Sequence, residues 1–138
     1  MRQKIWGAKL GLVLAALLFT AGCAAMLLMG LGGAAAIGSY KWVEGTMEKD
    51  YPRPMQECWN ATLAAAKDMN LKVQNQQYNP TESTMEAVAP PDTNVKIQLV
   101  ARPNQITTIK VRFGLMGNQD ASAYFHRQVL RHLGLPPT

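Results

Sequence analysis

The sequence predicts an α+β fold in which two helices cover one face of a small antiparallel sheet of four or five strands. Two stretches with apolar residues at three- and four-residue steps predict the helices, and several short stretches that alternate apolar and polar residues predict the strands. Short turns that contain proline or asparagine join the last four strands, which is typical of antiparallel pairing. The expected element order is strand, helix, four strands, helix.

The first predicted elements are a strand over residues 39–51 and a helix over residues 55–69. The strand alternates apolar and polar residues in part before it becomes polar. Proline is tolerated in the first turn of a helix, so Pro52-Arg53-Pro54 predicts the helix start, and Asn70 is placed to end the helix in a left-handed conformation. The predicted buried stripe of the helix comprises Met55, Trp59, Thr62, Leu63, Ala66 and Met69.

Four strands and a second helix follow. Leu71 and Val73 open the first of these strands, which then becomes polar. Alternation predicts the inward residues of the next three strands: Met85, Ala87 and Ala89, then Val95, Ile97, Leu99 and Ala101, and then Ile109, Val111 and Phe113. Asn118 or Asp120 can cap the last helix. Its predicted inward stripe comprises Ser122, Phe125, Val129 and Leu133. We expect residues 39–138 to form this single domain and to fold alone as a soluble monomer.

The N-terminal part has the composition of a secretory signal peptide. Its basic residues are Arg2, Lys4 and Lys9. Residues 10–19 are apolar and give way to small residues. Thr20-Ala21-Gly22-Cys23 resembles the lipobox that the bacterial lipoprotein pathway recognises, although such motifs usually carry leucine where Thr20 stands. We therefore predict that residues 1–22 are a removed signal peptide and that Cys23 carries a lipid.

Residues 23–38 are predicted to form an apolar Gly/Ala tether between the lipid and the domain. A mature lipoprotein carries more than one acyl chain, and each buried methylene contributes about 0.8 kcal/mol, so such an attachment is effectively permanent. The alternative is an uncleaved helix, because the 29 residues from 10 to 38 carry no charge and are long enough to cross a bilayer. Their small residues would then offer a packing face for oligomerisation.

Charge and cysteine content argue against a nucleic-acid-binding protein and against a disulfide-stabilised fold. The formal net charge of the 138-residue chain is +5. Three of the 14 basic residues belong to the signal peptide, so the mature chain has 11 basic against 9 acidic residues and a net charge of +2. This charge is too small to favour a nucleic-acid partner. Lipidation of Cys23 would leave Cys58, the only other cysteine, without an intramolecular partner.

No group of residues has the spacing of a catalytic, metal or cofactor site, and no small-molecule substrate can be identified. His126 and His132 lie about 240° apart on one helix, so they cannot hold a metal together, and both are expected at the surface. Cys58 lies beside Trp59 in an apolar helix and is expected to be a buried, unreactive thiol. The charged residues of the first strand suit a solvated segment of mixed charge: Lys41, Glu44, Glu48, Lys49 and Asp50.

Four basic residues form a candidate interaction site. Lys96, Arg102, Lys110 and Arg112 fall on the same side of two strands that are expected to pair. The ordinary interpretation of these four residues is that they belong to the solvent-exposed polar face of a sheet covered on its other side. The functional alternative is contact with anionic lipid head groups or an acidic polymer, helped by tethering close to the membrane.

The chain also carries motifs along most of its length: Gly22-Cys23 with its Gly/Ala tail, Tyr51-Pro52 before a helix with Trp59 and Ala61, Leu71-Lys72-Val73 after that helix, and Val111-Arg112-Phe113-Gly114-Leu115-Met116-Gly117 before the last helix. With these features the chain resembles a family of short bacterial lipoproteins known only as a domain of unknown function, DUF3568. The resemblance covers roughly residues 23–133. It implies an anchor and a small α+β domain, and it names no substrate and no active site.

These features together predict a non-enzymatic, membrane-anchored lipoprotein that serves as a structural or interaction module of the cell envelope. The expected partners are the membrane, through the lipid, and another envelope protein or anionic lipid, with no nucleic acid. The periplasmic face of the outer membrane is favoured over the inner membrane. An enzyme or accessory subunit acting on envelope lipid or glycan is the alternative, and it would need clustered catalytic residues that the sequence does not show.

Overall fold

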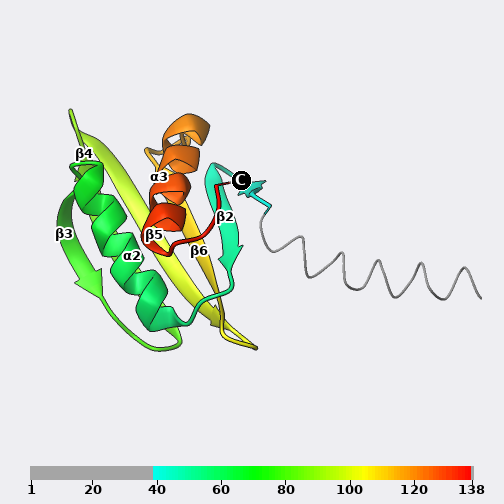
Figure 1. The fold of residues 1–138 in the computed structure, drawn as a ribbon. Coiled ribbons are helices and arrows are strands. Elements are labelled where there is room, and N and C mark those ends of the chain that lie inside the picture. The colour runs from blue at the N-terminus through cyan, green and yellow to red at the C-terminus, as the bar shows by residue number, and fades with distance from the viewer. Residues whose placement is uncertain (1–38, 138) are drawn as a thin grey trace, which may run out of the picture. The chain divides into compact units, whose positions relative to one another are not determined.

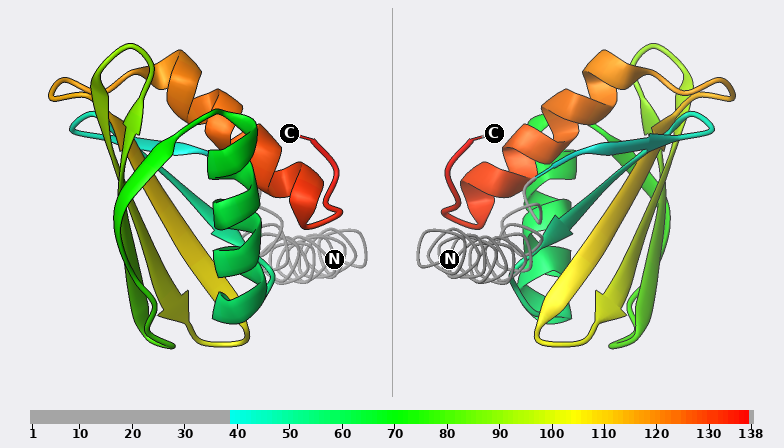
Figure 2. Two further views of the ribbon diagram at one scale, coloured as in Figure 1. Left: turned by 90° about the vertical axis from the view of Figure 1, so that its left-hand side faces the viewer. Right: turned by 90° about the vertical axis from the view of Figure 1, so that its right-hand side faces the viewer.

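The computed structural model describes residues 39–137. The strands are β1 (Lys41–Val43), β2 (Thr46–Tyr51), β3 (Lys72–Gln77), β4 (Glu82–Ala89), β5 (Thr93–Arg102) and β6 (Ile106–Phe113), and the helices are α2 (Met55–Asp68) and α3 (Gln119–His132). The strands form one antiparallel sheet in the order β1-β2-β6-β5-β4-β3. Both helices lie on the same face of this sheet (Figure 1), and among the described residues no helix covers the other face (Figure 2). The predicted signal peptide 1–22, the lipidated Cys23 and the tether 23–38 lie outside the described residues.

The fold class is confirmed, but the sheet has six strands rather than four or five. Residues 39–51, expected as one strand, contain the β1–β2 hairpin. Glu44 and Gly45 make its two-residue turn with φ angles of 48° and 81°, the left-handed conformation that such turns require. Asparagine or aspartate usually marks the first position of this turn. Because glutamate stands there instead, the sequence pattern does not reveal the hairpin.

The first helix ends one residue earlier than predicted. Four members of its predicted buried stripe are buried, whereas Leu63 and Met69 are only partly buried. α2 begins directly after Pro54, and Asn70 beyond its end has a φ of 54°. The Leu71 N–H donates to the Ala66 carbonyl oxygen at 2.9 Å and closes the helix. Trp59 is 7% exposed, so its predicted place in the core is confirmed. The buried residues of α2 are Met55, Cys58, Trp59, Ala61, Thr62, Ala65 and Ala66.

Alternate residues of the central strands point toward the helices and form the core. The directly opposed pairs of β5 and β6 are Val95 with Phe113, Ile97 with Val111, and Leu99 with Ile109. All six side chains are buried, which stabilises the fold by about 1.5–3 kcal/mol for each large one. The predicted alternation is therefore confirmed here, except at Ala101, which is exposed near the end of β5. At the far edge of the sheet, β3 is exposed at every position.

The last helix is fixed at both ends. The side chain of Asn118 caps it by accepting a hydrogen bond from the Ala121 N–H at 3.0 Å, as the sequence predicts. Near its C-terminal end, Arg131 Nη2 lies 3.0 Å from a carboxylate oxygen of Asp68, and His132 Nε2 contacts the same oxygen. His132 is at the surface, as expected. These contacts join the C-terminal ends of α2 and α3.

Two polar residues that were expected in solvent are buried. His126 is 0% exposed. It comes four residues after Ser122 and three before Val129, so it belongs to their inward stripe. Lys49 is 3% exposed because alternation in β2 places it on the helix-covered face, where its Nζ lies 4.3 Å from the centre of the Tyr40 ring. Both expectations are wrong. They assume that a polar side chain lies in solvent, whereas the helical or strand periodicity places these two positions on the buried face.

Candidate functional site

The sheet face away from the helices carries all four cations that the sequence singles out. The even-numbered residues of β2, β4, β5 and β6 lie on this uncovered face. Lys96 of β5 lies directly opposite Arg112 of β6, and Gln98 lies opposite Lys110. Arg102 is on the same side at the end of β5. The register therefore gathers three of the cations and leaves Arg102 farther along the strand.

Carboxylates from the neighbouring strands share the uncovered face, and the sequence analysis did not connect them with the cations. They are Glu48, Asp50, Glu82 and Glu86. Glu48 lies opposite Lys110, with 3.4 Å between its Oε1 and the lysine Nζ. Glu86 lies opposite Lys96. The cations of the two central strands therefore stand between carboxylates on β2 and β4, and these four strands carry four charges of each sign on this face.

Hydrogen bonds link further charges across this face. Arg102 Nε donates to the Thr108 hydroxyl at 3.1 Å, and this hydroxyl donates to a carboxylate oxygen of Asp50. Gln98 Nε2 donates to a carboxylate oxygen of Glu82. Several of the charged side chains are therefore held in place by neighbours on adjacent strands.

Two hollows open on the uncovered face, and Lys96 and Arg112 line both of them. The first has a volume of about 470 Å³, and its lining also includes Asp92, Asn94, Gly114 and Leu115. The second has a volume of about 360 Å³, and its lining also includes Val43, Glu44, Glu48 and Lys110. Arg112 Nε donates to the Gly114 carbonyl oxygen at 3.2 Å. This bond holds the guanidinium at the start of the loop that leaves β6.

The loop between β6 and α3 carries the most exposed apolar side chains of the described residues. Leu115 is 88% exposed and Met116 is 90% exposed. These two residues are called the apolar tip below. The backbone of Met116 lies against Gly45 of the β1–β2 turn. Both loops project on the sheet side, away from the helices (Figure 2). The two loops meet at glycines, since a Cβ at Gly117 would lie 2.2 Å from the Gly45 carbonyl oxygen. No local pattern in the sequence reveals this exposure, because it depends on a contact between distant loops.

A second cluster of polar residues is buried between α3 and β2, with His126 at its centre. Its Nδ1 lies 2.7 Å from the Tyr51 hydroxyl oxygen, and its Nε2 lies 3.1 Å from the Met47 carbonyl oxygen. A carbonyl oxygen can only accept, so Nε2 carries the proton and Nδ1 accepts from Tyr51. Burial, with a smaller effect from the charge of Lys49, lowers the pKa of His126 to about 4, although the bond to Met47 acts in the opposite direction. The imidazole is therefore neutral, and both its nitrogens are occupied within the protein.

Neither a reactive cysteine nor a metal site is found in the described part of the chain. Cys58 is 0% exposed, and burial raises the pKa of its thiol to about 11, so the predicted burial is confirmed. Within residues 39–137, no three His, Cys, Asp or Glu side chains lie close enough together to hold a metal ion. In the same part of the chain, the structure contains no helix with the length and apolar character needed to cross a membrane.

Comparison with known proteins identifies the family of the chain. No curated protein matches the sequence. A distant similarity is found to the crystal structure of CalU16 from Micromonospora echinospora, with 16% sequence identity, a TM-score of 0.40, and coverage of 70% of this chain and 80% of that chain. The model of the family described as protein of unknown function (DUF3568) matches residues 8–132. The chain therefore belongs to the DUF3568 family of proteins of unknown function.

Proposed function

We propose that this chain is a lipid-anchored, non-catalytic module of the bacterial cell envelope, attached to a membrane through Cys23 and binding another envelope component with its folded domain. The observation that carries the proposal is the sequence that leads to Cys23. A basic start, the apolar residues 10–19 and the small residues of Thr20-Ala21-Gly22-Cys23 follow one another in the order that export and lipidation require. The periplasmic face of the outer membrane is the favoured location.

The chemistry of the described domain supports a binding role over catalysis. A general base needs a nitrogen that can reach a substrate, whereas both nitrogens of His126 are engaged inside the protein. A nucleophilic cysteine needs an exposed thiol of low pKa, whereas Cys58 is buried with a pKa of about 11. The uncovered face, by contrast, presents ordered charges of both signs, which suits the recognition of a complementary surface.

Intact mass spectrometry of the chain purified from bacterial membranes tests the anchor. We expect the mass to show loss of residues 1–22 and gain of acyl chains on Cys23. Cys23→Ser should keep the leader and gain no acyl mass, while Cys58→Ala, the matched change at the other cysteine, should be processed normally. Recovery of an unmodified chain that begins at Met1 would refute the lipid anchor and support the alternative in which residues 10–38 span the membrane.

A further inference from the structure

The high exposure of the apolar tip indicates that a partner covers it. Single exposed hydrophobic residues are ordinary on protein surfaces. Leu115 and Met116, however, are adjacent, large and apolar, and they are 88% and 90% exposed. Complete burial of such a pair would remove a large apolar area from water, so a partner that covers the tip gains a substantial hydrophobic contribution.

The tip is held in a fixed position by the backbone around it. Gly114 and Gly117 bracket it with φ angles of 75° and 78°, which favour glycine. A Cβ at Gly45 would lie 2.7 Å from the Met116 carbonyl oxygen, so the β1–β2 turn packs directly against the tip's own backbone. Because the loop is already ordered, little conformational entropy is lost when a partner covers its side chains.

Cationic groups adjoin the tip on the same side of the sheet. Leu115 lines the first hollow together with Lys96 and Arg112, and the one carboxylate in that lining is Asp92. The charged residues that line this hollow therefore have a positive net charge. Apolar side chains beside cations match the surface of a phospholipid bilayer, where phosphates lie just outside the acyl region.

The length of chain between the predicted lipid and the domain keeps the domain within reach of a membrane. Residues 24–38 number fifteen and can span at most about 50 Å. They join the domain just before β1, and β1 leads directly into the Glu44–Gly45 turn that packs against the tip. A lipid on Cys23 therefore keeps the tip at a high effective concentration near the bilayer.

We infer that the apolar tip inserts into the phospholipid surface to which the chain is anchored, while Lys96 and Arg112 contact the phosphates of the lipid head groups. This inference rests on the proposed anchorage through Cys23. Insertion fixes the orientation of the domain. The helices then face away from the bilayer, because the tip projects on the opposite side of the sheet from them (Figure 2).

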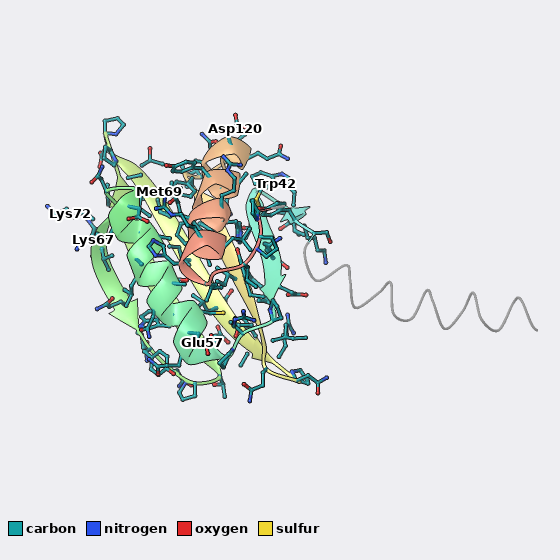
Figure 3. The ribbon with its side chains drawn as sticks, viewed as in Figure 1. Trp42, Glu57, Lys67, Met69, Lys72 and Asp120 are labelled. Carbon is teal, nitrogen blue, oxygen red and sulfur yellow. The ribbon has the colours of Figure 1, made fainter. Side chains whose placement is uncertain are left out.

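Depth-dependent fluorescence quenching tests the insertion on the full acylated chain in vesicles of phosphatidylethanolamine and phosphatidylglycerol. Met116→Cys, carrying an environment-sensitive fluorophore, reports on the tip, and Lys67→Cys with the same label on α2 is the control (Figure 3). Cys58 is buried and an acylated Cys23 has no thiol, so one label per chain is expected. Nitroxide lipids should quench the label at position 116 and spare the label at 67, whereas aqueous iodide should do the reverse.

The outcomes separate this inference from the proposed anchor. Iodide that reaches the label at position 116 as readily as the label at 67, on a chain whose mass shows acylation, would refute insertion and leave the anchor standing. Protection from iodide without quenching by nitroxide lipids would also refute it, because the tip would then be covered by protein. An intact mass without acyl chains would refute the anchor instead.

Charge variants in the chain labelled at position 116 test the contact with the phosphates. In the double variant Lys96→Gln with Arg112→Gln, the equilibrium constant between inserted and aqueous tip should fall by about fivefold for each cation removed. The label should then be quenched less by nitroxide lipids and more by iodide. Lys67→Gln with Arg127→Gln makes the same change of charge on the exposed surfaces of the helices and should leave the quenching unchanged. Equal effects of the two pairs would refute a specific contact of Lys96 and Arg112 with the head groups.

Discussion

The buried imidazole of His126 should make the domain lose stability as the pH falls below neutrality. The folded state holds His126 neutral with a pKa of about 4, whereas the ordinary value, which applies to the unfolded chain, is 6.5. The unfolded chain therefore binds a proton first as the pH falls. The folded state does not bind it until the pH nears 4, so the free energy of unfolding decreases across the window between these two values.

The size of the loss follows from the same two pKa values. A shift from 6.5 to about 4 implies a loss of roughly 2 kcal/mol between about pH 7.5 and pH 5, and of about 3 kcal/mol once the pH is below 4. The charged groups that face the ring include Lys49, whose own pKa burial lowers. The upper part of the window is the most informative, because carboxylates begin to titrate near its lower end. Urea unfolding of the fragment 39–138, followed by tryptophan fluorescence at several pH values, measures the loss.

A pair of histidine variants provides the control. His126→Gln keeps a side chain that can donate and accept hydrogen bonds but has no imidazole, so its stability should fall much less between pH 7.5 and 5. His132→Gln, which alters the exposed contact with Asp68, should keep the slope. Retention of the slope in His126→Gln would refute the reasoning. Should that variant fail to fold, NMR titration of the original protein decides the matter, because protonation of His126 near pH 6.5 would contradict a buried, neutral ring.

Three further predictions concern stability and reactivity of the described domain. Gly117→Ala should lower the free energy of unfolding, measured by chemical denaturation, by at least about 2 kcal/mol, because it adds a clash to an unfavourable φ. Gly134→Ala, where φ is 67° and the space is open, should lower it by only about 1 kcal/mol. Equal losses in the two variants would contradict the loop contact. Trp59→Ala should lower the free energy of unfolding by roughly 3–5 kcal/mol. Trp42 is 40% exposed, so Trp42→Ala should lower it clearly less. The reverse order would contradict the described core. Cys58 should react with a thiol reagent only when denaturant unfolds the chain, and rapid labelling of the native protein would show that its burial is wrong.

Local periodicity was enough to predict both helices and the strands from β3 to β6. Except for β3, which is polar and exposed, each of these elements places its apolar side chains on one face, so the repeat is visible without knowledge of its neighbours. The β1–β2 hairpin was missed because β1 has three residues and its turn contains Glu44 in a left-handed conformation. His126 and Lys49 were misplaced because their burial depends on tertiary partners: hydrogen bonds for the histidine and the Tyr40 ring for the lysine.

The candidate site could be predicted only in part, for a similar reason. Alternation fixes which face of a strand a residue occupies, so the shared face of Lys96 and Arg112 follows from the sequence. The carboxylates on that face come from β2 and β4, and the pairing of β2 with β6 joins segments about sixty residues apart. The exposure of the apolar tip depends on the contact between Gly45 and Gly117, which is also distant in sequence. Neither feature is encoded in a local repeat.

The mixture of cations and carboxylates on the uncovered face bears on how the domain could meet a membrane. An anionic surface laid flat on this face would attract its cations but would also meet the carboxylates of β2 and β4, and it would compete with existing contacts such as that between Lys110 and Glu48. Such exposed pairs contribute little to folding, yet separating them and desolvating the carboxylates is unfavourable. The apolar tip meets no such opposition, because its side chains lose only contact with water. Contact through the end of the sheet that carries the tip is therefore favoured over contact through the whole face, and it leaves the remaining charges free to bind a partner from the envelope.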